Sequence, residues 1–143
     1  MRIGIYDPYL DTLGGGEKYM LYIAKLLADK NETIFFWDDK TIFEKAESKF
    51  GIDLSKVVIE KNIFSKKTPI YKRLIESRKF DVIIADPPYY NADQVDYKTL
   101  SRYLRESGLL VISHPPDVTP DVSLKRIDHR EYAGGNISFY KQN

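Results

Sequence analysis

Cysteine is absent from this sequence, which excludes disulfide bonds, thiolate metal sites and a cysteine nucleophile. Net charge is nearly absent as well: 22 basic and 21 acidic residues leave +1, so no charge excess indicates nucleic acid or an anionic membrane as a partner. No apolar run approaches transmembrane length, and the first residues read as a strand rather than a signal peptide. We therefore expect a soluble, cytoplasmic protein with no membrane partner.

The residues that are present have the balance of an ordinary globular domain. Hydrophobic residues make up 43% and charged residues 30% of the 143 positions, which excludes disorder, collagen and low complexity. The length is that of one domain, and no repeat or linker divides the chain. We predict a single domain over residues 1–143.

Short apolar or β-branched runs alternate with segments of helical period along most of the chain. The runs predict strands at residues 2–6, 33–37, 57–60, 80–85 and 109–113. The segments between them predict helices at 17–29 and 40–50, one beginning at Thr68-Pro69, and one from about 93 to 106. Strand–helix alternation is typical of a parallel sheet that is covered on both faces.

The end of the chain breaks this alternation. Three prolines after residue 113 exclude another helix, and two further runs, 124–132 and 136–141, flank a Gly134-Gly135 turn and predict a hairpin. We therefore predict an α/β fold: a three-layer, doubly wound, Rossmann-like sheet, mostly parallel, with a C-terminal β-hairpin. The predicted strand order is 3-2-1-4-5-7-6.

Ligands of such sheets bind at the carboxyl ends of the strands, near the switch between strands 1 and 4. Asp86-Pro87-Pro88-Tyr89 lies there, directly after the run FDVIIA. Two prolines stiffen the turn, so that the Asp86 carboxylate and backbone carbonyls can accept hydrogen bonds from an exocyclic amine and orient its lone pair. Tyr89 can stack on a base. The alternative is a strand terminator followed by a surface aromatic.

Two weaker signals lie at the same predicted edge. Gly14, Gly15 and Gly16 precede a helix, where backbone N–H groups can approach a phosphate, although a flexible helix start explains them equally well. Asp38 and Asp39 follow the second strand, where an acid commonly accepts from ribose hydroxyls; the alternative is a helix cap.

The two histidines are expected to be structural or surface residues. His114 lies between a strand and two prolines, and His129 lies in a charged strand. No spacing indicates a metal site, and no Ser/His/Asp arrangement is present.

The first part of the chain resembles the amino-terminal domain of a family-4 GT-B glycosyltransferase. The segment MRIGIYDPYLDTLGGGEKYMLYIAKLLADK, with its Gly-Gly-Gly-Glu loop, carries the likeness, which covers residues 1–83. The resemblance implies a second Rossmann-like domain that holds most of the nucleotide-sugar site, and no residues remain to build it.

The second part resembles a SAM-dependent amino-methyltransferase, similar to the ribosomal-RNA guanine-N2 methyltransferases of the RsmD type. The Asp-Pro-Pro-Tyr motif at Asp86–Tyr89 and the closing hairpin REYAGGNISFYK carry this likeness over residues 84–143. The resemblance implies a glycine-rich cofactor loop soon after the first strand. Here Asp7 is followed by Pro8-Tyr9-Leu10, and glycines begin only at Gly14.

The two likenesses together predict an engineered chimera, a Rossmann-like scaffold with no selected catalytic activity, no cofactor and no identifiable partner. Two alternatives stay open. One is a methyltransferase acting on an exocyclic amine of RNA or DNA, with S-adenosylmethionine as cofactor and catalytic residues Asp86, Pro87, Pro88 and Tyr89. The other is a nucleotide or sugar-phosphate binding module that uses Gly14, Gly15, Gly16 and Glu17.

Overall fold

The computed structural model of the chain describes residues 1–61 and 80–142, and these form one seven-stranded sheet. Its strands, in chain order, are β1 (Arg2–Tyr6), β2 (Glu32–Phe36), β3 (Val58–Glu60), β4 (Phe80–Ala85), β5 (Leu104–His114), β6 (Lys125–Tyr132) and β7 (Gly135–Lys141). The spatial order is β3-β2-β1-β4-β5-β7-β6, and β7 runs in the opposite direction to all the other strands. The predicted fold class and strand order are confirmed.

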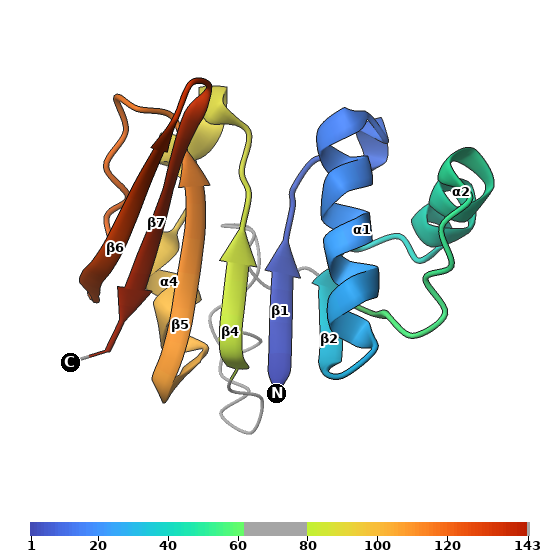
Figure 1. The fold of residues 1–143 in the computed structure, drawn as a ribbon, viewed down its shortest axis with the longest axis horizontal. Helices are drawn as coiled ribbons and strands as arrows, with labels where there is room; N and C mark the ends of the chain where they lie inside the picture. Colours follow the sequence, from blue (N-terminus) through green and yellow to red (C-terminus); the bar gives the residue numbers. More distant parts are fainter. Residues whose placement is uncertain (62–79, 143) are drawn as a thin grey trace.

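The parallel strands all end at one edge of the sheet, which is the upper edge in Figure 1. In this view helix α1 (Gly15–Ala28) lies in front of the sheet, α2 (Thr41–Phe50) lies to the right of α1, and α4 (Tyr97–Arg102) lies behind β5. Among the described residues, no helix is long and apolar enough to cross a membrane.

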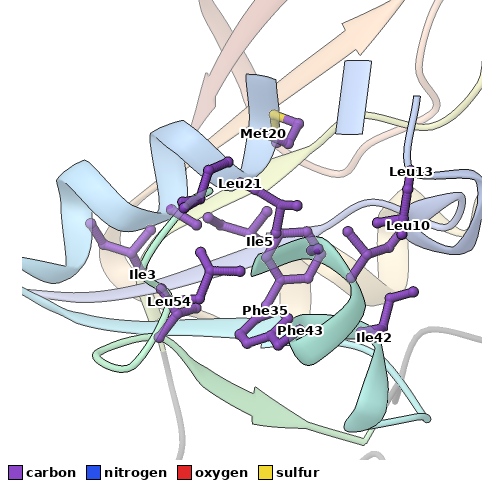
Figure 2. Close-up of a cluster of buried hydrophobic side chains, with 14 residues drawn as sticks. Ile3, Ile5, Leu10, Leu13, Met20, Leu21, Phe35, Ile42, Phe43 and Leu54 are labelled. Carbon is purple, nitrogen blue, oxygen red and sulfur yellow. The ribbon is translucent and has the colours of Figure 1, made fainter. Parts of the chain in front are cut away.

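Alternation along each strand divides the core into two clusters, one on each face. Ile3 and Ile5 of β1 join the cluster beneath α1, whereas Tyr6 joins the cluster beneath α4. Figure 2 shows the first cluster, in which Leu21 of α1 and Phe35 of β2 point toward the same centre. This period of two along the strands is the reason that both faces can be buried.

The burial of α1 leads to a first prediction. Leu21 is fully buried and Leu26 is 69% exposed on the same helix. We expect Leu21→Ala to lower the free energy of unfolding by about 2–5 kcal/mol, because it removes buried methyl groups and leaves a cavity. Leu26→Ala, the matched control, should change it by no more than about 0.5 kcal/mol. Urea unfolding measures both, and equal losses would contradict the described packing.

One predicted helix is wrong in its length. In place of a helix from about 93 to 106, a 3-10 helix covers Tyr89–Gln94 and α4 follows only at Tyr97. Asp96 sets that start, because its side chain accepts from the backbone N–H of Thr99 at 3.0 Å. The chain then returns to the sheet at Leu104, which pairs with Phe80, so β5 is longer than predicted. The helix predicted from Thr68-Pro69 lies outside the described residues.

Candidate functional site

A cavity of about 430 Å³ opens at the carboxyl edge of the sheet, between the segments that follow β1 and β4. The strands β1 and β4 are neighbours, and the chain order reverses between them, so this is the switch point expected for a ligand site. The residues that line it are Asp7, Tyr9, Thr12, Gly16, Glu17, Asp86, Pro87, Pro88, Tyr89 and Tyr90.

Asp7 forms the floor of this cavity, one residue after β1 ends. Its side chain is 4% exposed, and its Oδ1 accepts from the backbone N–H of Tyr9 at 3.0 Å. Burial, together with the nearby carboxylates of Asp86, Glu17 and Asp11, raises the pKa of the Asp7 carboxyl to about 7, although the hydrogen bond from Tyr9 lowers it. Asp7 is therefore partly protonated near neutral pH.

Asp86 lies beside Asp7 because β4 pairs with β1. The backbone N–H of Asp86 donates to the Tyr6 carbonyl at 3.0 Å, which continues the sheet pairing by one residue. Burial raises the pKa of the Asp86 carboxyl and the Glu17 carboxylate adds to the rise, whereas a hydrogen bond from the Ser113 hydroxyl opposes it. Two partly buried carboxyls thus share one cavity.

Three tyrosines surround the cavity. The rings of Tyr9 and Tyr90 meet edge to face with centroids 5.6 Å apart, which joins the loop after β1 to the segment after β4. The third, Tyr89, is 41% exposed, and its hydroxyl lies 3.3 Å from Ser113 Oγ. Pro88 has extended dihedral angles, φ −63° and ψ 143°, immediately before Tyr89. The residues predicted from Asp86–Tyr89 are thus brought together at the cavity.

Gly14 precedes α1, and Gly15 and Gly16 are the first two residues of that helix. Helix α1 begins at Gly15, two residues earlier than predicted, and the Glu17 carboxylate accepts from the Gly14 N–H at 2.8 Å. Of the three glycines, Gly16 lines the cavity. A carboxylate on this N–H, with Asp7 and Asp86 nearby, opposes the binding of a phosphate.

Asp38 and Asp39 do not line the cavity, and both side chains are exposed. Asp39 Oδ1 accepts from the Thr41 N–H at 2.9 Å and from its hydroxyl at 2.8 Å, at the start of α2. These hydrogen bonds lower the pKa of the Asp39 carboxyl. The Asp39 carboxylate thus closes a turn onto Thr41, the first residue of α2, while Lys40 is the N-cap residue of that helix.

His114 ends β5, and His129 lies in β6 of the C-terminal hairpin. His114 is 2% exposed; its Nδ1 lies 2.9 Å from the Pro115 carbonyl and its Nε2 lies 2.9 Å from Ser138 Oγ. Ser138 Oγ is also 2.9 Å from His129 Nδ1. His114 is structural as expected, whereas His129 is half-buried and hydrogen-bonded rather than a fully solvated residue.

The sequence analysis assigned no role to several residues of this region. Asp7 had a usable signal, because an acid directly follows a buried strand. Tyr9 follows Asp7 in the same loop, at the predicted carboxyl end of the first strand. Ser113 and Gly135 had none, because each meets Tyr89 only through the pairing of strands that are distant in the chain.

Comparison with known proteins identifies the fold of this chain but assigns it to no family. No protein-family model matches the chain, and no curated protein sequence matches it. Solved structures with the same fold include the fibrillarin pre-rRNA processing protein of Methanococcus jannaschii, with a TM-score of 0.63 and 15% identity over 99% of this chain and 66% of that one. The rRNA methyltransferase aviRa of Streptomyces viridochromogenes has a TM-score of 0.56 and 12% identity over 96% and 76%. A predicted O-methyltransferase of Agrobacterium tumefaciens has 0.62 and 15% over 97% and 72%.

These likenesses define the class of fold as Rossmann-like, in the form that methyltransferases have. They run across residue 83 without a break, because each covers nearly the whole chain. They give no support to a glycosyltransferase half or to a chimera. The prediction of an engineered scaffold without catalytic activity is therefore corrected, and the methyltransferase alternative is the better supported of the two.

Proposed function

We propose that this chain is a methyltransferase that uses S-adenosylmethionine and acts on an exocyclic amine of RNA or DNA. One observation carries the proposal: Asp86-Pro87-Pro88-Tyr89 directly follows β4 and lines the cavity at the switch point of the sheet. The methyltransferases that share the fold support it.

The residues of the cavity suit this cofactor in charge and in size. S-Adenosylmethionine, when bound, supplies an electrophilic methyl group on a positively charged sulfonium. The carboxyl groups of Asp7, Glu17 and Asp86 offer negative charge to its sulfonium and ammonium groups. The volume lies within the range of about 300–1,000 Å³ that is usual for small-molecule sites.

The chain's own residues would hold the amine. The Asp86 carboxylate and the Pro87 carbonyl accept hydrogen bonds from its two N–H groups, which turns the nitrogen lone pair toward the cofactor. Asp86 also stabilises the positive charge that develops on the nitrogen. The Tyr89 ring stacks on the base and fixes its plane. The enzyme acts mainly by orientation, in a site where the two prolines limit backbone motion.

Binding of S-adenosylhomocysteine tests the proposal first. At about a hundredfold excess over Kd, we expect the ligand to raise Tm by roughly 5–10 °C, because it binds the folded state alone. Isothermal titration calorimetry should give saturable binding in the same samples. A uridine diphosphate sugar is the control, since the carboxylates oppose phosphate. Unchanged heat and unchanged Tm with S-adenosylhomocysteine would contradict the proposal, and a response to the sugar nucleotide alone would favour the nucleotide-binding alternative.

A further inference from the structure

We infer that Ser113 at the end of β5 and Gly135 at the start of β7 are positioning residues, which set where Tyr89 and Asp86 lie in the site. The kinetic part of this inference rests on the proposed function, whereas its structural part does not.

Gly135 provides the space that Tyr89 occupies. A Cβ atom built on Gly135 would lie 1.9 Å from the Tyr89 hydroxyl oxygen and 2.4 and 2.7 Å from two ring carbons. Real Cβ atoms do not approach that closely, so any side chain at residue 135 displaces the ring. Because Gly135 belongs to β7, the hairpin at the end of the chain forms one wall of the position that Tyr89 takes.

Ser113 connects the two residues of the motif through its hydroxyl. The Tyr89 hydroxyl lies 3.3 Å from Ser113 Oγ, and the Ser113 hydroxyl lowers the pKa of the Asp86 carboxyl, as a hydrogen-bond donor does. A carboxylate only accepts, so Ser113 donates to Asp86, and its oxygen is then available to accept from Tyr89. The three groups form a directed chain from phenol to carboxylate.

The hairpin that carries Gly135 is held against β5 by a second hydrogen-bonded chain. The Pro115 carbonyl only accepts, so His114 Nδ1 donates to it, and Nε2 of the same ring lies 2.9 Å from Ser138 Oγ. Ser138 Oγ also lies 2.9 Å from His129 Nδ1, which joins β5, β7 and β6. Ser113 of β5 pairs with Ile137 of β7, which lies close to Gly135 on the same strand. The pairing of β5 with β7 therefore fixes the two positioning residues relative to each other. These hydrogen bonds hold β7 rigidly, as is required if Gly135 is to fix the position of the Tyr89 ring.

Gly135→Ala, with Gly134→Ala as the matched control, tests the first half of the inference. A Cβ on Gly134 meets nothing within 4 Å. We expect the ring resonances of Tyr89 to shift in Gly135→Ala and to stay in place in Gly134→Ala. The fold should persist in both, since Tyr89 is at the surface and can turn outward. In assays with RNA, KM should rise roughly tenfold in Gly135→Ala with a smaller change in kcat, the loss of one stacked base.

Ser113→Ala, with Ser113→Thr as the conservative variant, tests the second half. Removal of the hydroxyl takes a donor from the Asp86 carboxylate, whose titratable neighbours are Glu17 and Asp7. We expect the carboxyl ¹³C titration of Asp86 to move to higher pH in Ser113→Ala, and the acid limb of the kcat/KM profile to move with it. Ser113→Thr should restore both.

The outcomes separate this inference from the proposed function. Tyr89 resonances that coincide in Gly135→Ala and the wild type would overturn the role of Gly135. An Asp86 titration that is equal in Ser113→Ala and the wild type would overturn the role of Ser113. Both readings are made without cofactor or substrate. A protein in which they come out as expected, but which neither binds S-adenosylhomocysteine nor methylates RNA or DNA, would overturn the proposed function and leave the positioning intact.

Discussion

Asp86→Asn is expected to lower kcat for methyl transfer by about 100- to 1,000-fold, the size of effect seen when one preorganised electrostatic contact to a transition state is removed. The asparagine keeps the shape of the side chain and can still accept one hydrogen bond. It removes the negative charge that stabilises the nitrogen as it becomes cationic. Single-turnover rates at saturating substrate measure the step directly.

The variant is not expected to lose its fold. Burial raises the pKa of the Asp86 carboxyl, so the native state holds this charge at a disadvantage, and an uncharged side chain removes that disadvantage. Its urea midpoint at neutral pH should be no lower than that of the wild type. Asp117→Asn, an exposed carboxylate after β5, is the control and should retain full activity. A kcat for Asp86→Asn within a fewfold of the wild type would contradict the role of Asp86.

Asp7→Asn is expected to raise the free energy of unfolding by about 2–4 kcal/mol near pH 8 and by little near pH 4. Raising the pKa of a buried carboxyl from 3.8 to about 7 corresponds to about 4 kcal/mol between its two protonation states. Asparagine keeps the Oδ1 atom that accepts from Tyr9. Urea unfolding at several pH values, in wild type and variant, measures the difference.

The sign follows from which state binds the proton more tightly. The folded pKa of Asp7 lies above the unfolded one, so its contribution to stability is fully present below about pH 4 and is lost as pH rises through about 7. The wild type should therefore become less stable across that range relative to Asp7→Asn. Asp11→Asn, an exposed carboxylate in the same loop, should follow the wild type. Parallel pH curves for Asp7→Asn and the wild type would show that Asp7 is not desolvated.

Much of the fold could be predicted because its signals are local and periodic. Apolar runs such as Arg2–Tyr6 and the α1 pattern agree with the structure within two residues. The helix before β5 failed for a tertiary reason: Asp96 caps a shorter helix, and Leu104 leaves it to pair with Phe80. A pairing partner distant in the chain outweighed the local helical pattern.

Residues of the candidate site could be predicted only where the end of a strand fixes their position. Asp86–Tyr89 lies at the predicted edge because a proline pair must end β4, whatever packs around it. Asp39 has the right position along the chain, but its carboxylate accepts from Thr41 and does not line the cavity. The place of Asp39 after the second strand did not determine the direction in which its side chain points.

The sequence by itself determined the class of fold, the order of its strands and the edge at which the cavity opens, because hydrophobic period, turn residues and the handedness of crossovers act over short stretches of chain. Only the tertiary structure decided that Asp7 and Asp86 share one cavity and that the last hairpin supports Tyr89. Those contacts join residues that lie far apart in the chain. Their energies depend on burial and on distances of a few ångströms, which no local pattern encodes.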